Sequence, residues 1–451
     1  MMLNLRETAL ALAGHLTGPG EVAFSRVTTD SRDIRAGDLF VALKGERFDG
    51  HDFAAAALAQ GAVAVLVQQP LDGGNHIVVS DTLAALGTLA HYWRKKLNPV
   101  VVAITGSNGK TTVKEMTATV LAHCAGKDAV LATQGNLNNH IGVPLTLLSL
   151  REGHRYAVVE MGMNHSGEID YLTRLAEPDV ALVNNAGSAH LEALGSVEGV
   201  ARAKGEIFAG LGKKGVAIIN ADDAYAELWA QLALGHKQLT FGTRSAEVAA
   251  RQIVPQAGAS DFILSAPHAE AQLHLAVPGL HNIRNALAAT AVACALGFNL
   301  NDIADGLESY QGVKGRLQAK TAFNGARLID DSYNANPDSM KAAIDVLVGA
   351  GEDTVLVLGD IGEIGSDGPR LHGEIGAYAH ARGIRTLYTL GEQMQHAAAA
   401  FAGAQHFADA DSLIAALRQR LAPASVALVK GSRFMRMERV VDALATSEEG
   451  Q

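Results

Sequence analysis

The sequence predicts an α/β protein with three domains, and three observations carry that prediction. The chain has 451 residues, which exceeds one ordinary core and favours about three domains. Hydrophobic residues make up 48% and aromatic residues only 5%, a balance typical of α/β proteins rich in alanine, valine and leucine. Short apolar runs also alternate with helical patterns along the chain, as in parallel sheets covered by helices.

Composition and charge exclude several classes of protein. The net charge of −10 disfavours nucleic acid and anionic membranes as general partners. Cys124 and Cys294 are too few and too far apart for a disulfide framework or a zinc site. Arg6, Glu7 and His15 interrupt the apolar N-terminal segment, and no run of about 18 apolar residues occurs. We therefore expect a soluble cytoplasmic protein without membrane insertion, and a monomer is the default expectation.

The first 84 residues are predicted to form a small α/β domain. Apolar runs at 39–43 and 62–67 are separated by polar turns that contain glycine. A helical pattern covers 82–97, and Asn98-Pro99 ends it. We place the first domain boundary between residues 84 and 85.

Residues 85–314 are predicted to form a central domain with a mostly parallel sheet. Its strands are expected at 100–105, 156–161, 179–184 and 216–220. The alternation restarts near residue 315, so residues 315–451 are predicted to form a C-terminal domain of doubly wound, Rossmann-like type. Its strands are expected at 327–330, 354–359, 386–390 and 426–430, with helices between them such as 339–348.

The stretch VVAITGSNGKTT, residues 101–112, predicts a phosphate-binding loop. An apolar strand enters a Gly-x-x-Gly-Lys-Thr-Thr turn and a helix follows, so backbone N–H groups would surround an anion. The usual G-x-x-x-x-G-K-[ST] pattern has glycine where this chain has Ile104. Lys110 would meet the β- and γ-phosphates, and the Thr111 hydroxyl would reach Mg²⁺. The central domain is thus expected to be a P-loop ATPase domain, with ATP contacts from Gly106, Ser107, Asn108, Gly109, Lys110, Thr111 and Thr112.

Glu160 and His190 each follow a predicted strand. The carboxyl ends of parallel strands face the crevice where ligands bind. Because Mg²⁺ prefers oxygen ligands and substrate phosphates, Glu160 beside a phosphate loop is a candidate metal ligand. A lone histidine is more often structural, so His190 becomes a candidate only in combination with Glu160.

Lys204 lies in the helical pattern VEGVARAKGEIFAGL. At about 100° per residue it falls in one apolar stripe with Val200, Ile207 and Leu211. A surface lysine whose charged end reaches solvent is one interpretation. The alternative is a desolvated amine of lowered pKa, available for covalent modification or as a charge partner.

These motifs together resemble the Mur ligase family of amide-forming enzymes. The similar segments are TGSNGKTT, Glu160, His190 and AKGEI around Lys204. The resemblance implies ATP and two Mg²⁺ ions as cofactors, with Thr111, Glu160 and His190 as metal ligands. It also implies that CO₂ carbamylates Lys204 and that the carbamate helps to hold the second Mg²⁺. The implied catalytic residues are Lys110, Lys204, His190 and Arg316.

Further segments resemble the rest of the family's ATP site. In PGLHNIRNALAA, Asn282 would contact the adenine side and Asn285 would support it, although asparagine is also a common helix cap. Arg316 would reach the γ-phosphate, where a guanidinium suits phosphoryl transfer. Asp331 and Asn336, in DDSYNANP, would close over the ribose and phosphates.

The resemblance extends to substrate-binding segments. DSRDIRAGDLFVALKGERFDGHDF is similar to the family's binding segment for a UDP-linked peptide, which implies contacts from Ser31, Arg32, Lys44, Asp49, Gly50 and His51. Turn chemistry alone would also explain these residue types. The segment 136–144 resembles the one that faces the muramoyl substrate, which makes candidates of Asn136, Asn138 and Asn139.

Motifs in the third domain distinguish family members that add different substrates. The chain lacks the Asp-Asn-Pro-Arg motif of members that add a diamino acid. LGDIGEIG (358–365) and VKGSRFMRME (429–438) instead resemble members that add D-alanyl-D-alanine, with Ile364 where leucine is common. The implied activity is ATP-dependent ligation through an acyl phosphate in peptidoglycan synthesis. The implied partners are UDP-N-acetylmuramoyl-tripeptide and D-alanyl-D-alanine.

Two other interpretations stay open. A tripeptide-forming Mur ligase or another ATP-dependent amino-acid ligase would share the loop, and a nucleotide-gated binding protein would hydrolyse ATP without joining substrates. The gated protein would need neither a lysine in an apolar stripe nor nucleotide contacts from a third domain. For a ligase we expect the domains to close around the substrates, with hinges near 97–100 and 313–316. No motif identifies the general base or the residues that select D-alanyl-D-alanine.

Overall fold

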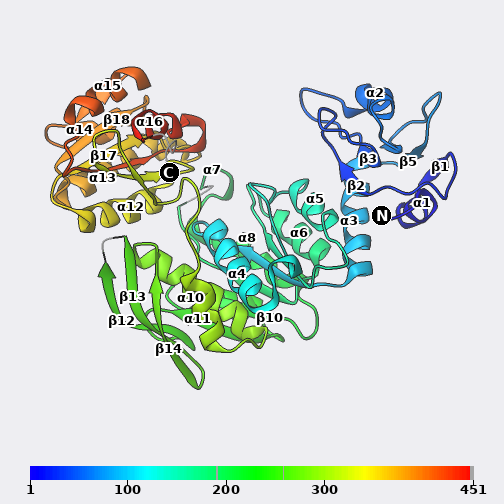
Figure 1. Cartoon of the computed structure of the whole chain (residues 1–451), viewed down its shortest axis with the longest axis horizontal. Helices are drawn as coiled ribbons and strands as arrows, with labels where there is room; N and C mark the ends of the chain where they lie inside the picture. The colour runs from blue at the N-terminus through cyan, green and yellow to red at the C-terminus, as the bar shows by residue number, and fades with distance from the viewer. Residues whose placement is uncertain (189–190, 257, 447–451) are drawn as a thin grey trace.

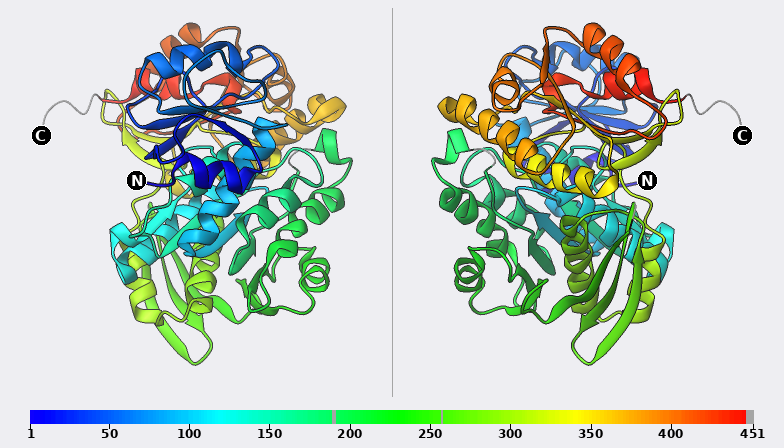
Figure 2. Two further views of the ribbon diagram at one scale, coloured as in Figure 1. Left: turned by 90° about the vertical axis from the view of Figure 1, so that its right-hand side faces the viewer. Right: turned by 90° about the vertical axis from the view of Figure 1, so that its left-hand side faces the viewer.

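A computed structural model describes residues 1–188, 191–256 and 258–446, and this part of the chain folds into three lobes with a sheet in each (Figure 1). The N-terminal and C-terminal lobes lie on the same side of the central lobe, as the views in Figure 2 also show. Helices pack against mostly parallel sheets throughout, which confirms the predicted α/β class.

The N-terminal lobe is built on a small sheet. Its strand order is β1 (His15–Thr17), β5 (His76–Val78), β4 (Ala64–Val67), β3 (Asp38–Val41) and β2 (Arg26–Thr28). The β1–β5 pair is antiparallel, and the other neighbours are parallel. Every residue of β3 and β4 is buried, because helices α1 (Leu5–Leu12) and α2 (Ala54–Ala59) and the adjoining loops cover the sheet.

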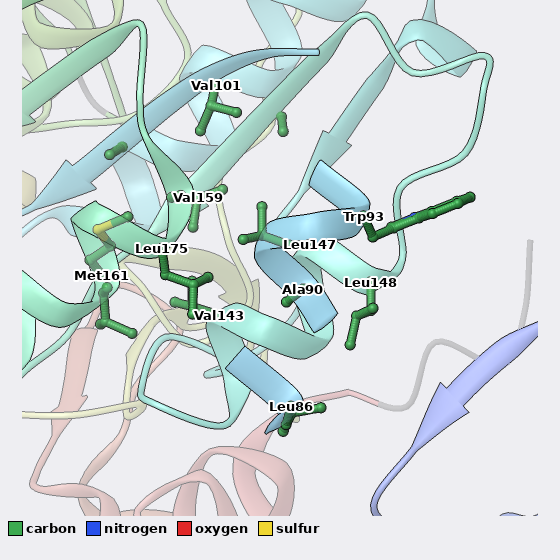
Figure 3. Packing of buried hydrophobic residues seen from close by; sticks show 14 of the residues in the cluster. Leu86, Ala90, Trp93, Val101, Val143, Leu147, Leu148, Val159, Met161 and Leu175 are labelled. Carbon is green, nitrogen blue, oxygen red and sulfur yellow. The ribbon is translucent and has the colours of Figure 1, made fainter. Parts of the chain in front are cut away.

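Helix α3 (Thr82–Leu97) connects the N-terminal and central lobes. The Asp81 side chain caps its start, and Asn98 ends it in a left-handed conformation, at the predicted residue. Leu86, Ala90 and Trp93 of α3 lie in the same apolar cluster as residues of α5 (Gly142–Leu148) (Figure 3). One continuous core therefore joins these lobes. The domain boundaries at residues 84/85 and 314/315 stay predictions.

The central sheet carries the phosphate loop. Its order is β14 (Ala269–Leu275), β13 (Ala259–Ala266), β12 (Val248–Gln256), β11 (Lys237–Gly242), β10 (Val216–Asn220), β9 (Val180–Val183), β6 (Val100–Thr105), β8 (Tyr156–Glu160) and β7 (Val130–Ala132). The pairs from β12 to β7 are parallel, as predicted. The antiparallel extension β12–β14, at the lower left of Figure 1, was not predicted.

Helices cover both faces of the central sheet. One face packs against α4 (Lys110–Ala125), α10 (Leu280–Ala295) and α11 (Leu300–Glu308). The other face packs against α3, α5, α6 (Glu168–Ala176), α8 (Val197–Gly205) and α9 (Ala226–Leu232), and the short α7 (Leu191–Leu194) precedes α8. This two-sided burial explains why the parallel strands read as continuous apolar runs in the sequence.

The C-terminal lobe is doubly wound, as predicted. Its strand order is β15 (Gln318–Thr321), β16 (Arg327–Asp331), β20 (Val426–Lys430), β17 (Thr354–Gly359), β18 (Thr386–Leu390) and β19 (Gln405–Phe407). Only the β15–β16 pair is antiparallel. The helices on its two faces are α12 (Pro337–Ala350), α13 (Gly368–Ala381), α14 (Gln395–Ala399), α15 (Ala410–Arg420) and α16 (Glu438–Leu444). Across the described ranges, no helix is both long enough and apolar enough to span a bilayer.

Candidate active site

A cleft of about 690 Å³ lies between the central and C-terminal lobes. That volume falls within the range of ordinary small-molecule sites. Residues of both lobes line it, among them the phosphate loop, Glu160 at the end of β8 and Lys430 at the end of β20. The carboxyl ends of parallel strands meet at this edge of each sheet, which is where α/β folds place ligands.

The phosphate loop connects β6 to α4. Gly109 has φ +78°, and a Cβ there would lie 2.4 Å from Asn285 Oδ1 and 2.6 Å from Asn184 Nδ2, so the position requires glycine. Half-buried Lys110 donates from Nζ to the Gly106 carbonyl at 2.7 Å. Burial lowers the pKa of Lys110; the Glu160 carboxylate opposes this effect, Arg316 adds to it and Glu363 opposes it.

Asparagines hold the loop in place. The Asn108 N–H donates to Asn185 Oδ1 at 2.8 Å, and its carbonyl accepts from the Asn184 and Asn185 amides at 2.9 and 3.0 Å. Asn184 also donates to Asn285 Oδ1 at 3.0 Å. From the C-terminal lobe, the Asn336 amide donates to Asn108 Oδ1 at 2.7 Å. Asn108 thus connects the end of β9 and the start of α12 to the loop.

Glu160 has the properties of a metal ligand. Its side chain is 2% exposed, and Oε1 accepts from the Asn138 amide at 2.8 Å. Oε2 is buried without a hydrogen-bond partner among the described residues. A buried carboxylate oxygen left in this way is costly unless a cation meets it. Nowhere in the described chain, this site included, do three His, Cys, Asp or Glu side chains converge, so Mg²⁺ here would also need the Thr111 hydroxyl, phosphate oxygens or water.

Lys204 is buried, as the apolar stripe predicted, and is 1% exposed. Its amine has no hydrogen bond or ion pair within the described ranges. Burial holds the pKa of Lys204 well below its usual range, and repulsion from Lys110 adds to the shift. The helix does not run to residue 211 as expected, since α8 ends at Gly205 and a 3₁₀ turn follows. His190, the other candidate ligand, lies outside the described residues.

The C-terminal lobe contacts the phosphate loop directly. Arg316 donates from Nη2 to Thr111 Oγ1 at 3.0 Å, and its guanidinium lies 4.5 Å from the centre of the Tyr333 ring. Asp331 pairs with Lys430 at 2.7 Å. These side chains therefore lie opposite the loop where a triphosphate would bind.

Most of the residues predicted to bind ATP or a metal ion line the cleft. It is lined by Ser107, Asn108, Gly109, Lys110, Thr111, Thr112, Glu160, Asn282, Asn285, Arg316, Asp331 and Asn336, together with Asn136 and Asn138 of the predicted substrate segment. Among the described candidates, Gly106, Asn139 and Lys204 are not part of its lining. Asn139 Oδ1 instead accepts from the N–H groups of Ile141 and Gly142 at the start of α5.

The predicted residues of the N-terminal lobe lie outside this cleft. None of the described side chains Ser31, Arg32, Lys44, Asp49, Gly50 and His51 lines the cleft. Asp49 Oδ1 lies 2.6 Å from His51 Nδ1, and His51 Nε2 accepts from the Gln68 N–H at 3.0 Å. A Cβ at Gly50 would lie 2.7 Å from the Leu43 N and O atoms, so close backbone approach explains this glycine. Arg32 is 88% exposed and pairs with Asp30.

Several residues of the cleft were not predicted as site residues. The polar ones include Asn184, Asn185, Asn220, Asp222, Asp223, His281, Arg284, Tyr310, Tyr333, Asp338, Glu363, Lys430 and Arg433. Burial lowers the pKa of His281 to about 4, so its ring is neutral near pH 7. A usable signal existed for Asn184, Asn220 and Lys430, because each ends or directly follows a strand whose carboxyl end reaches the cleft.

Comparisons with known proteins agree with this geometry. Three family models match: the catalytic domain of the Mur ligase family at 23–105, the Mur ligase middle domain at 104–293, and the glutamate ligase domain of Mur ligases at 315–433. The chain is 45% identical over 447 residues to the UDP-N-acetylmuramoyl-tripeptide–D-alanyl-D-alanine ligase of Escherichia coli, with 98% of both chains covered.

Solved structures are similar over almost the same length. A crystal structure of MurF from Acinetobacter baumannii matches with a TM-score of 0.92 and 38% identity, covering 98% of both chains. The MurF ligase from Thermotoga maritima in complex with ADP matches with a TM-score of 0.84 and 28% identity, covering 93% of this chain and 96% of that one.

Proposed function

The chain belongs to the Mur ligase family, and from that premise we propose that it joins D-alanyl-D-alanine to UDP-N-acetylmuramoyl-tripeptide with conversion of ATP to ADP and phosphate. The product is the UDP-linked pentapeptide precursor of peptidoglycan. One observation carries the proposal beyond the comparisons: the phosphate loop, Glu160 and the C-terminal Arg316, Asp331 and Asn336 line one cleft. The reaction would take place in the cytoplasm, where ATP and nucleotide-linked precursors occur.

The first step activates the donor. The terminal carboxylate of the tripeptide attacks the γ-phosphorus of ATP, the bond to the β–γ bridging oxygen breaks, and an acyl phosphate and ADP result. Two anions must approach each other, so cations that surround the phosphates lower the barrier. Lys110 and Arg316, which lie on opposite lobes of the cleft, supply that charge.

Magnesium would be held by Glu160 and the Thr111 hydroxyl, where it would neutralise phosphate charge. The unpartnered Glu160 Oε2 supports this placement. For a second ion, the family resemblance adds His190 and a carbamylated Lys204. The neutral amine of a buried lysine can add to CO₂, forming an N–C bond with release of one proton, and the burial of Lys204 fits that chemistry.

The remaining contacts follow from the family resemblance, and the place of several of these residues in the cleft supports them. Asn282 and Asn285 would face the adenosine side, and Asp331 and Asn336 the ribose and phosphates, since all four line the cleft. Asn136 and Asn138 would meet the muramoyl end of the donor. The UDP group would bind the N-terminal lobe through the group that contains Ser31, Arg32, Lys44, Asp49, Gly50 and His51.

The second step forms the amide. The amine of D-alanyl-D-alanine attacks the acyl carbon, loses a proton, and the tetrahedral intermediate collapses with departure of phosphate. Because acyl phosphates hydrolyse, the cleft has to exclude water while the amine arrives.

The test is phosphate release with ATP, Mg²⁺, the UDP-linked tripeptide and D-alanyl-D-alanine, with each component omitted in turn. We expect release to require both substrates and the product mass to be that of the UDP-linked pentapeptide. Rapid release with ATP alone would favour a nucleotide-gated protein instead. A product formed with a diamino acid would favour the tripeptide-forming ligase.

A further inference from the structure

The proposed reaction needs a site for a cationic amine, and neither the motifs nor the comparisons assign one. D-Alanyl-D-alanine is a zwitterion whose ammonium end must come close to the acyl phosphate. A carboxylate beside the phosphate loop would draw that end in and orient it. Such a site has a role only if the proposed function holds, so the inference rests on that function.

Glu363 is a carboxylate in the required place. It belongs to the segment 360–367, which connects β17 to α13, and its exposed side chain lines the cleft. Its charge acts on Lys110 of the phosphate loop, although the two residues belong to different lobes. An ammonium group at Glu363 would therefore arrive on the side of the cleft that faces the phosphates.

The backbone around Glu363 is held in a specific conformation. Its φ of +61° is left-handed, which is disfavoured for a residue with a side chain. The flanking Ile361 and Ile364 are buried at 3% and 7% exposure and anchor the segment in the core of the lobe. The Gly362 N–H also donates to Ser432 Oγ at 2.9 Å, so the segments after β17 and β20 lie side by side.

His372 holds both ends of this segment. It is 0% exposed, its Nε2 accepts from the Ile361 N–H at 3.0 Å, and its Nδ1 donates to the Gly368 carbonyl at 2.7 Å. These two partners require a neutral ring with the proton on Nδ1. Burial lowers the pKa of His372, which favours that neutral form.

The charged side chains around Glu363 in the C-terminal lobe suit a dipeptide with one positive and one negative end. Asp331 is paired with Lys430, and Asp338 accepts from the Ser188 N–H at 2.8 Å across the lobes. Arg433 follows Ser432 and also lines the cleft, so a cation lies on the segment next to Glu363. Its guanidinium pairs with Glu438 at 3.0 Å in an exposed ion pair that a substrate carboxylate could replace. A dipeptide spans at most about 7 Å, and opposite charges on adjacent segments suit its two ends.

We propose that Glu363 binds the ammonium group of the acceptor dipeptide, and that His372 is a positioning residue which fixes the segment carrying Glu363. Because its carboxylate is exposed, Glu363 can exchange its partners in the chain for the ammonium group of the substrate.

The first experiment compares Glu363→Gln with Asp367→Asn. Asp367 is exposed on the same segment and pairs with Arg370, but it is not part of the cleft lining, so it serves as the matched control. We expect Glu363→Gln to raise the KM for D-alanyl-D-alanine by about ten-fold or more, while the KM for ATP stays within about two-fold. The control should leave all three substrate KM values within about two-fold.

A second nucleophile separates this inference from the proposed function. Hydroxylamine is neutral near pH 7 and traps an acyl phosphate as a hydroxamate without needing an ammonium site. Hydroxamate formation should be the same in Glu363→Gln as in the unaltered chain. An unchanged KM for D-alanyl-D-alanine in this variant would overturn the inference alone. Failure of the unaltered chain to form hydroxamate would overturn the proposed function.

Non-additivity tests the role of His372. His372→Leu removes both ring contacts and should raise the KM for D-alanyl-D-alanine as Glu363→Gln does, with hydroxamate formation retained. The double variant should show little further increase, because both changes remove one interaction. Independent, multiplying effects would overturn the positioning role. Should His372→Leu not fold, His372→Gln keeps an acceptor for the Ile361 N–H and should show a smaller rise in the same KM.

Discussion

At the scale of single residues, two buried polar groups in or behind the cleft do not contribute to the stability of the fold. Among the described residues, Glu160 is buried with one carboxylate oxygen unpartnered, and Lys204 is a buried amine without a partner. Each arrangement costs stability in the protein alone. A protein can retain such unfavourable groups where a bound ligand offsets their cost in stability. For this reason we place the metal ion at Glu160 and the carbamate on Lys204.

The variant Glu160→Gln separates the effect of Glu160 on protein stability from its proposed role in binding Mg²⁺. We expect the ligand-free variant to have a Tm equal to or above that of the unaltered protein, because a buried charge is removed and the contact to Asn138 can remain. The Tm increase caused by Mg²⁺ with a non-hydrolysable ATP analogue should largely disappear. Glu227→Gln, an exposed change on α9, is the control. An undiminished Mg²⁺-dependent Tm shift in Glu160→Gln would exclude Glu160 as a metal ligand.

The lowered pKa of Lys204 predicts how stability depends on pH. Burial is the main cause of the shift, so between the folded-state pKa and the ordinary value near 10.5 the unfolded chain binds more protons. The free energy of unfolding, measured without CO₂, should therefore rise with pH in that window. Lys204→Met should show a weaker rise, because it lacks the titrating amine. Parallel curves for the two proteins would contradict a neutral buried amine.

Carbamylation of Lys204 has a direct spectroscopic readout. In ¹³CO₂-saturated buffer, the unaltered protein should show a carbamate ¹³C resonance that Lys204→Met lacks. Lys213→Met, at an exposed lysine nearby in the sequence, should keep the resonance. A resonance that survives in Lys204→Met would assign the carbamate to another amine.

Residue-level prediction from the sequence succeeded where a local pattern carried the information. The burial of Lys204 followed from the apolar stripe, and the place of Glu160 from its strand end. The position of Glu363 could not be predicted in this way. It depends on the docking of a C-terminal segment against a loop some 250 residues earlier in the chain, and no spacing rule encodes that docking.

At the scale of elements, the phosphate loop is a tightly constrained turn. Gly109→Ala places a Cβ against the Asn285 and Asn184 amides and forces alanine into a positive φ. We expect ATP binding to be lost and the free energy of unfolding to fall by about 1–3 kcal/mol. Gly126→Ala, at the other end of α4, also has a positive φ but has nothing within 4 Å. It should cost about 1–3 kcal/mol through backbone strain alone. ATP binding should stay intact, so calorimetric titration of both variants with ATP separates the steric contact in the loop from backbone strain.

The elements themselves were largely predictable. Strands β6, β10, β17, β18 and β20 begin and end at the predicted residues, because each is an apolar run closed by polar residues. The strands of the antiparallel extension were missed even though β13 alternates buried and half-buried residues, a pattern of period two. Helix α8 ends at Gly205, earlier than the sequence pattern predicted. A Cβ at Gly205 would lie 2.4 Å from Leu232, so the helix packs closely on α9 at this point.

At the scale of the whole molecule, the UDP candidates and the cleft belong to different lobes (Figure 1). The UDP-linked tripeptide would bind the N-terminal lobe and reach into the cleft at the same time, so its binding should bring the lobes closer together. We expect the radius of gyration, measured by small-angle scattering, to decrease when a non-hydrolysable ATP analogue and the UDP-linked tripeptide are both present. Either ligand alone should cause a smaller change. A constant radius would exclude hinge closure near 97–100 and 313–316.

The order of the C-terminal sheet also concerns how the protein is made. Strand β20 is the last strand in the chain, yet it lies between β16 and β17 in the interior of the sheet. While a ribosome is still delivering residues before 426, β16 and β17 have no partner between them, and Lys430 and Arg433 have not been added. A nascent chain would already carry the phosphate loop and Arg316, Asp331 and Asn336, but the sheet that positions the C-terminal wall of the cleft would be incomplete. The enzyme would become competent only near the end of translation, so fragments of interrupted synthesis would not consume ATP.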